Sequence, residues 1–201
     1  MAEMAEILRI KQLFELLAHE NPFISEQISI LLANVSNSCY FSHILVTDRC
    51  MSAIVRILRR ETEEAPSEAC LLAILIAVLN LSSLKEIIRG VERLRFMPSL
   101  QDIVRDPEIP YVNKSIALLA ISNIYTLSEK AEICESTKQL AFDILTRQKE
   151  MEENPEVVKN LVYSSLILFY NIVLKNKDPE VASFAIQKSL LAILNQTIKN
   201  F

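Results

Sequence analysis

The sequence is nearly devoid of glycine, since its 201 residues include one, Gly90, alongside seven prolines. Glycine supplies the positive-φ backbone of tight hairpin turns and of loops that cradle phosphates. A P-loop and a GxGxxG fingerprint each need at least two glycines, so both are excluded. A sheet-rich fold with many tight turns is disfavoured as well. Because 51% of the residues are hydrophobic and 23% are charged, the chain has the composition of a folded protein, and an all-α fold is predicted.

Neither charge is in strong excess, because 21 Lys and Arg residues are interspersed with 25 Asp and Glu residues. Nucleic-acid binding usually requires a basic stripe, whereas the one basic cluster, Arg56 to Arg60, is followed at once by glutamates. The longest apolar run, Ala69–Leu79, is far shorter than the ~20 residues that span a bilayer. The first 20 residues carry charges throughout, unlike a signal peptide. We therefore expect no nucleic-acid or membrane partner and a cytoplasmic location, with the nucleus as the alternative.

Residues for metal binding and catalysis are scarce. There is no CxxC pair, and the only histidines are His19 and His43. Zinc sites need clustered ligands, so no metal and no cofactor are predicted. We find no Cys–His or Ser–His set that suggests a nucleophile, and we predict that the chain is not an enzyme. A carboxylate dyad assembled across helices stays open as an alternative. The four cysteines lie far apart, at Cys39, Cys50, Cys70 and Cys134.

The sequence does contain a repeat. Four hydrophobic segments each close with an apolar–x–Asn–apolar quartet, and the intervals between their asparagines are 46, 43 and 48 residues. Tetratricopeptide and ankyrin repeats, at about 33–34 residues, are too short, whereas armadillo and HEAT repeats of roughly 40–47 residues fit. The four asparagines are Asn34, Asn80, Asn123 and Asn171.

Each asparagine segment follows a shorter helical segment and a proline-bearing turn. Proline in such a turn stops the earlier helix and favours the start of the next one. The predicted long helices are Phe23–Ser36, Ala69–Leu79, Tyr111–Leu127 and Val157–Leu174. The predicted shorter helices are Ile7–Leu17, Cys50–Arg60, Phe96–Val104 and Leu140–Leu145. Further helices are predicted at Cys39–Val46, Leu84–Val91, Glu129–Glu135 and Glu180–Ile198. Residues expected in the core are Leu75, Val78, Leu118, Leu119 and Leu166.

Residues 50–83, CMSAIVRILRRETEEAPSEACLLAILIAVLNLSS, and 96–128, FMPSLQDIVRDPEIPYVNKSIALLAISNIYTLS, resemble the second and third helices of the armadillo family. The resemblance implies a right-handed α-solenoid of about four armadillo-like repeats plus a C-terminal capping helix, in a single domain over residues 1–201. The implied units are residues 1–38, 39–83, 84–127 and 128–175, followed by a cap at 176–201. The family's glycine between the first and second helices is absent here, so a HEAT-like variant remains open.

In that family the third helices line a concave groove, and the asparagine amide grips the backbone of an extended peptide through one donor and one acceptor. The resemblance therefore implies that Asn34, Asn80, Asn123 and Asn171 hold a peptide. The alternative is that each braces a neighbouring turn. Four residues before these asparagines stand Ile30, Ile76, Leu119 and Ile167. Nuclear-import members have tryptophan there, and the sequence contains none, which argues against a receptor for nuclear-localisation signals.

We add Ile76, Leu119 and Tyr125 to the groove candidates, with core packing as the alternative for Tyr125. The predicted function is a noncatalytic protein-interaction module, or adaptor, that binds a segment of a partner protein along the groove. The alternatives are a structural subunit of a larger assembly and a chaperone cofactor that clasps an ATPase domain. The ends of the stack are expected to pair with a partner or to self-associate weakly.

Overall fold

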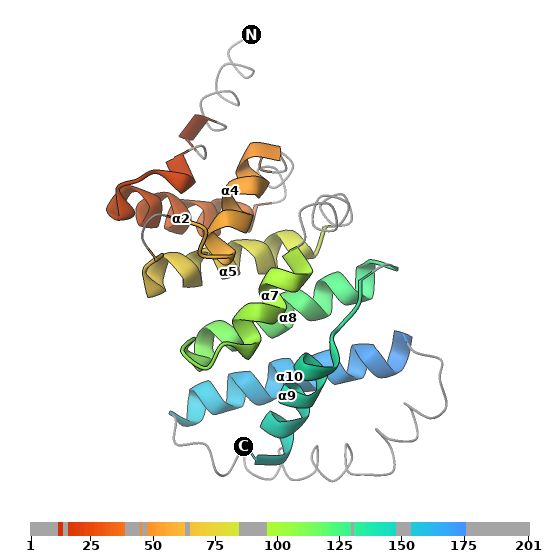
Figure 1. Ribbon diagram of the computed structural model, residues 1–201. Coiled ribbons are helices and arrows are strands. Elements are labelled where there is room, and N and C mark those ends of the chain that lie inside the picture. Colours follow the sequence, from red (N-terminus) through yellow and green to blue (C-terminus); the bar gives the residue numbers. More distant parts are fainter. Residues whose placement is uncertain are drawn as a thin grey trace.

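A computed structural model of the chain describes residues 12–13, 16–38, 45, 48–62, 65–84, 96–129, 131–147 and 154–175. Every regular element in these ranges is a helix, and no strand occurs among them, so the all-α prediction is confirmed there (Figure 1). None of the helices in the described ranges is long and apolar enough to cross a lipid bilayer. Besides the short 3-10 helix η1 (Leu16–Ala18), the helices are α2 (Pro22–Ser36), α4 (Asp48–Leu58), α5 (Glu68–Ser82), α7 (Phe96–Arg105), α8 (Tyr111–Leu127), α9 (Glu135–Arg147) and α10 (Pro155–Lys175).

The helices form two layers. The long helices α2, α5, α8 and α10 lie side by side in chain order, each packed on the next, and all four run in the same direction (Figure 1). The shorter helices α4, α7 and α9 form the second layer, where α7 contacts both α4 and α9. Each shorter helix also packs on the long helix that follows it in the chain. This pairing leaves one face of the long-helix layer turned away from the shorter helices.

Side-chain caps define the starts of α2 and α5. Asn21 accepts a hydrogen bond from the backbone N–H of Phe23 at 3.0 Å, and Ser67 accepts one from the N–H of Cys70 at 3.1 Å. These side chains satisfy backbone donors that have no partner within the helix. Prolines open α2 and α10, as the proline-bearing turns predicted.

Because glycine is scarce, the turn after α4 contains an arginine in a conformation that glycine usually adopts. Arg60 adopts φ 54°, the left-handed conformation that usually falls to glycine after a helix. Its N–H donates to the carbonyl of Ile57 at 3.0 Å, and the N–H of Glu61 donates to the carbonyl of Arg56 at 2.9 Å. The Arg60 guanidinium lies 3.1 Å from the carboxylate of Asp106, which follows α7. The turn after α4 is thereby tied to the turn after α7.

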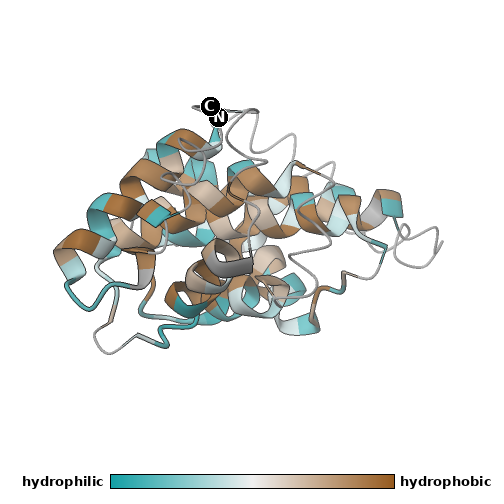
Figure 2. Cartoon of the chain, turned by 90° about the horizontal axis from the view of Figure 1, so that it is seen from above, coloured by the Kyte–Doolittle hydropathy of each residue, from teal (hydrophilic) through white to brown (hydrophobic). Residues whose placement is uncertain are grey.

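The core lies between the two layers, and apolar residues run along the long helices (Figure 2). Leu75, Val78 and Leu118 are buried as predicted. Leu119 and Leu166 are only half-buried, so the prediction of nearly complete burial is wrong for these two. The long helices are apolar on almost every side, and hydrophobicity alone therefore did not separate their buried residues from those on the outer face.

The predicted helix at Glu129–Glu135 is also wrong. The described residues between Ser128 and Cys134 are irregular, and α9 begins at Glu135. Gln101 of α7 provides the physical reason, because its amide oxygen accepts from the N–H of Cys134 at 2.7 Å and its amide nitrogen donates to the carbonyl of Glu132 at 3.2 Å. These backbone groups are paired without a helix. The predicted helices at Ile7–Leu17, Cys39–Val46, Leu84–Val91 and Glu180–Ile198 lie wholly or largely outside the described residues.

Candidate binding surface

Three of the four repeated asparagines connect neighbouring long helices. The amide nitrogen of Asn80 on α5 donates to the hydroxyl of Ser36 at 3.0 Å and to the carbonyl of Ala33 at 3.3 Å, both on α2. Asn123 on α8 donates to Ser82 Oγ on α5 at 3.1 Å. On α10, Asn171 repeats the arrangement with a 2.7 Å bond to Ser122 Oγ of α8. Each amide thus reaches back to the preceding long helix, which is the contact expected of a brace between adjacent helices.

Asn34, by contrast, is exposed. It lies on α2, the first of the four long helices in the described part of the chain, where no earlier long helix offers an acceptor. Asn80, Asn123 and Asn171 are half-buried. The position of Asn34 in its helix is equivalent, and its greater exposure follows from its place at the edge of the layer.

A row of aliphatic side chains lies beside the asparagines. Ile30 is exposed, and Ile76, Leu119 and Ile167 are half-buried. Each stands one helical turn before an asparagine on the same helix, so the two rows cross the same side of the layer. We call the surface made by these two rows the long-helix face. Its eight residues are Ile30, Asn34, Ile76, Asn80, Leu119, Asn123, Ile167 and Asn171.

Large exposed apolar side chains extend this face at both ends. On α10, Tyr163 is 61% exposed, and Tyr170 and Leu174 are similarly exposed. These three residues and Ile167 follow helical spacing and therefore share one side of α10. On α2, Phe23 is 69% exposed and stands two turns before Ile30. The residues proposed from the sequence did not include Tyr163, Leu174 and Phe23. Their helical spacing from Asn171 or Asn34 places them on the same side of the helix and could have identified them.

Charged groups are rare along this face and frequent at one edge of it. After Glu68, α5 carries no charged residue, and the single charged residue of α8, Lys114, is buried. Burial lowers the pKa of the Lys114 ammonium, against the opposing effect of Asp106. The beginnings of the long helices, which lie at one edge of the layer, carry exposed carboxylates at Glu20, Glu68, Glu108 and Glu156. The surface is therefore uncharged along α5 and α8, whereas α2 carries Glu26 and α10 carries Lys159, whose ammonium lies 3.9 Å from the carboxylate of Glu156.

Tyr125 does not belong to the long-helix face. Its side chain is 7% exposed, and the ammonium group of Lys175 lies 4.1 Å from the centroid of its ring. The same ammonium donates to the backbone carbonyls of Tyr125 and Ser128. Lys175 thereby satisfies acceptors at the end of α8, where a positive charge is favourable. Tyr125 has the burial expected from the core-packing alternative.

We expect the bond between Asn123 and Ser82 to be measurable in a double-mutant cycle. Asn123→Ala and Ser82→Ala should each lower the free energy of unfolding by ~1 kcal/mol, with a coupling energy of ~0.5–1.5 kcal/mol, the usual net value of one such bond. Urea denaturation of the four proteins gives the coupling. Asn34→Ala is the matched control and should cost less than ~0.5 kcal/mol because Asn34 is exposed. Additive effects of Asn123→Ala and Ser82→Ala would contradict the brace.

A separate cavity of about 240 Å³ lies near the start of α2 and brings together residues that the sequence keeps far apart. His19, Ser25, Arg56 and Cys70 all line it. The Cys70 thiol is 2% exposed and lies 3.3 Å from the hydroxyl of Ser29. The sequence did not indicate that His19 and Cys70 would line the same cavity, because they lie far apart in the chain. The His19 Nδ1 atom accepts a hydrogen bond from the backbone N–H of Asn21, so the bond that it makes stays within its own turn.

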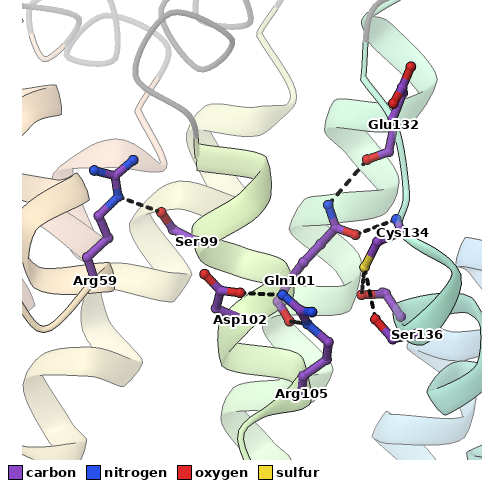
Figure 3. Close-up of polar contacts among 9 residues, drawn as sticks. Arg59, Ser99, Gln101, Asp102, Arg105, Glu132, Cys134 and Ser136 are labelled. Atoms are coloured by element: carbon purple, nitrogen blue, oxygen red, sulfur yellow. Dashed lines mark hydrogen bonds and ion pairs between the residues drawn. The ribbon is translucent and has the colours of Figure 1, made fainter.

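Several separate polar contacts lie along α7 and near Cys134 (Figure 3). Arg59 donates to Ser99 at 3.3 Å, and Asp102 pairs with Arg105. The Cys134 sulfur lies 3.2 Å from the Ser136 hydroxyl and 3.1 Å from the Thr137 hydroxyl. Burial by itself raises the pKa of the Cys134 thiol, but these hydroxyls, the Thr137 backbone N–H and the positive charge of Arg105 lower it overall. At Cys50, by contrast, burial raises the thiol pKa to about 12.

Cys134 should therefore be alkylated faster than Cys50 or Cys70. Its lowered pKa gives it more thiolate at neutral pH, and it is half-exposed whereas the other two are buried. We expect a rate with iodoacetamide at pH 7 at least about tenfold higher, followed by mass spectrometry of the separate peptides. Thr137→Val should slow the reaction of Cys134, and Thr146→Val on the same helix should not. Equal rates at the three thiols would contradict this assignment.

No group of three or more His, Cys, Asp or Glu residues that could hold a metal ion occurs in the described ranges. The three cysteines that the structure describes, Cys50, Cys70 and Cys134, are free thiols. Comparison with models of known protein families gives no match, and comparison with curated protein sequences gives none.

Proposed function

We propose that the chain is a noncatalytic protein-interaction module whose long-helix face holds a segment of a partner protein. The observation that carries the proposal is the aliphatic row of Ile30, Ile76, Leu119 and Ile167, which is exposed or half-buried. Exposed apolar patches on a folded protein mark sites of interaction. Tyr163 and Tyr170 enlarge this patch, and tyrosine is enriched where proteins meet.

We further propose that the four units form an armadillo-like α-solenoid. The regular intervals between the asparagines support this, as do the parallel long helices stacked in chain order with a shorter helix packed on each of the last three. In such a stack a unit contacts only its neighbours, and its outer surface is continuous from one end to the other. A continuous surface of this kind suits a partner segment that crosses several helices.

A structural subunit is the second candidate. The exposed large apolar side chains gather on the outer long helices, with Phe23 and Leu31 on α2 and Tyr163 and Leu174 on α10. Apolar surface at the ends of a helical stack favours permanent association with another subunit. In that case the partner would cover the ends rather than the middle of the long-helix face.

Site-specific photocrosslinking tests the proposal. A benzophenone amino acid placed at Ile76 or Leu119, in the middle of the face, should give a discrete covalent adduct in an extract of the source cells. The matched control places the same group at Thr146 on α9, in the layer of shorter helices. Mass spectrometry identifies the partner and the crosslinked peptide.

Three outcomes decide between the candidates. Adducts from Ile76 and Leu119 but not from Thr146 support binding on the face. Adducts confined to a group placed at Phe23 or Leu174 favour the structural subunit. Equal adducts from the face and from Thr146, or none from any position, would contradict both.

A further inference from the structure

The cavity near the start of α2 shares no residue with the long-helix face and draws its lining from several elements. Its volume is about 240 Å³. His19 comes from the turn before α2, Arg56 comes from α4, and Ser67 comes from the residue that caps α5. Sites for drug-sized ligands usually measure about 300–1,000 Å³, so a ligand that fits this cavity is small.

Arg56 supplies a cation to the cavity. The guanidinium groups of Arg59, Arg60 and Arg105 each lie beside a carboxylate. Among the residues that the structure describes, no carboxylate pairs with Arg56 in this way. A guanidinium is always charged, and its N–H groups form a fork that matches the oxygens of a phosphate or a carboxylate. Arg56 is therefore available to an anionic ligand.

The imidazole of His19 is a second donor without an acceptor in this part of the chain. Its Nδ1 atom accepts from the N–H of Asn21 at 3.0 Å, so the neutral ring carries its proton on Nε2. The nearby hydroxyls have already used their protons, because Ser25 donates to a backbone carbonyl and Ser67 donates to the carboxylate of Glu26. The imidazole and the guanidinium together call for a ligand that is rich in acceptors.

The charge balance of the lining also favours an anion. Its charged residues in the described part of the chain are Arg56 and Glu20. Both α2 and α5 begin at the cavity, where Pro22 and Ser67 line it. The start of a helix carries about half a positive elementary charge, so the two starts together offset about one carboxylate. The charge of Arg56 remains for the ligand.

From these observations we infer that the cavity binds the phosphate group of a small molecule, with Arg56 holding two of its oxygens and Nε2 of His19 donating to a third. A tetrahedral phosphate presents oxygens in several directions, which suits two donors that come from different elements. Inorganic phosphate and a phosphomonoester share this chemistry. The inference goes beyond the proposed function, because it concerns other residues and requires no partner protein.

Isothermal titration calorimetry of the full chain tests the inference with inorganic phosphate, glycerol 3-phosphate and acetate. We expect a Kd below about 1 mM for at least one of the two phosphate probes and at least about tenfold weaker binding of acetate. Tighter binding of glycerol 3-phosphate would assign the site to an esterified phosphate. Equal or tighter binding of inorganic phosphate would assign it to the free ion.

Substitutions in the lining then localise the binding. Arg56→Gln should weaken it at least about tenfold and His19→Ala about threefold, because each removes a donor to the anion. Glu20→Gln should strengthen it at least about twofold, because it removes a like charge. Arg105→Gln on α7 makes the same change as Arg56→Gln outside the cavity and should alter the affinity less than about twofold, since exposed charges are screened. Circular dichroism verifies that each variant is folded.

Four results would overturn the inference. The first is a Kd above about 10 mM for both phosphate probes, and the second is acetate binding as tightly as they do. The third is an equal effect of Arg56→Gln and Arg105→Gln. The fourth concerns Glu63 and Glu64, which follow Thr62 in the sequence and lie outside the described residues. Phosphate binding that appears only after both are changed to glutamine would mean that the chain's own carboxylates occupy Arg56.

Discussion

Leu118→Ala is expected to lower the free energy of unfolding by ~2–5 kcal/mol, the range for deleting a fully buried leucine side chain. Leu118 has no exposed surface and lies in the middle of α8, which packs on α5, α7 and α10. A cavity there removes contacts that several helices share, and none of them can move to fill it without losing other contacts. Denaturation in urea followed by circular dichroism gives the difference.

Val112→Ala is the matched control for Leu118→Ala. Val112 lies on the same helix but is exposed, so its truncation should cost less than ~1 kcal/mol. A loss below ~1 kcal/mol for Leu118→Ala would mean that the buried side of α8 has been assigned wrongly. Equal losses for the two variants would mean the same.

Phe96→Ala should cost ~3–5 kcal/mol, the range for a buried aromatic side chain. Phe96 is 1% exposed at the start of α7, and it is the largest of the fully buried side chains in the described ranges. Phe23→Ala makes the same chemical change at a side chain that is 69% exposed. We expect less than ~1 kcal/mol there. Thermal unfolding of both variants measures the contrast, and similar midpoints would contradict the placement of Phe96 in the core.

The proline-bearing turns and the hydrophobic runs were enough to predict most helices of the described ranges. The predicted segment Tyr111–Leu127 is the observed helix α8, and Phe23–Ser36 differs from α2 by one residue. The ends of these helices could be predicted from the sequence because each depends on a proline, a cap or a change of polarity a few residues away. The repeat units and the peptide-binding role of the asparagines remain predictions.

The errors concern interactions between residues that are distant in the sequence. Gln101 of α7 forms hydrogen bonds with the backbone groups of Glu132 and Cys134. The sequence of residues 129–135 does not indicate that a side chain from another helix makes these bonds. The side of each long helix that faces outward was ambiguous for a similar reason, because Leu118 and Leu119 are adjacent leucines that differ only in what packs on them. For Tyr125 the sequence left both the groove and core packing open, and the residue that lies over its ring, Lys175, is 50 residues away.

The bonds between the long helices have a direction with a consequence for synthesis on the ribosome. In each pair the later helix supplies the amide donor, and the earlier helix supplies the serine hydroxyl. Ser36 and Ser82 already donate their hydroxyl protons within their own helices, to Ala33 and Leu79. When α5 has formed, the hydroxyl proton of Ser82 is therefore already used within that helix, and its oxygen can accept from Asn123 of α8. Each later asparagine therefore meets an acceptor on a helix that has already been synthesised, and none of these three bonds depends on a serine that is still to be made.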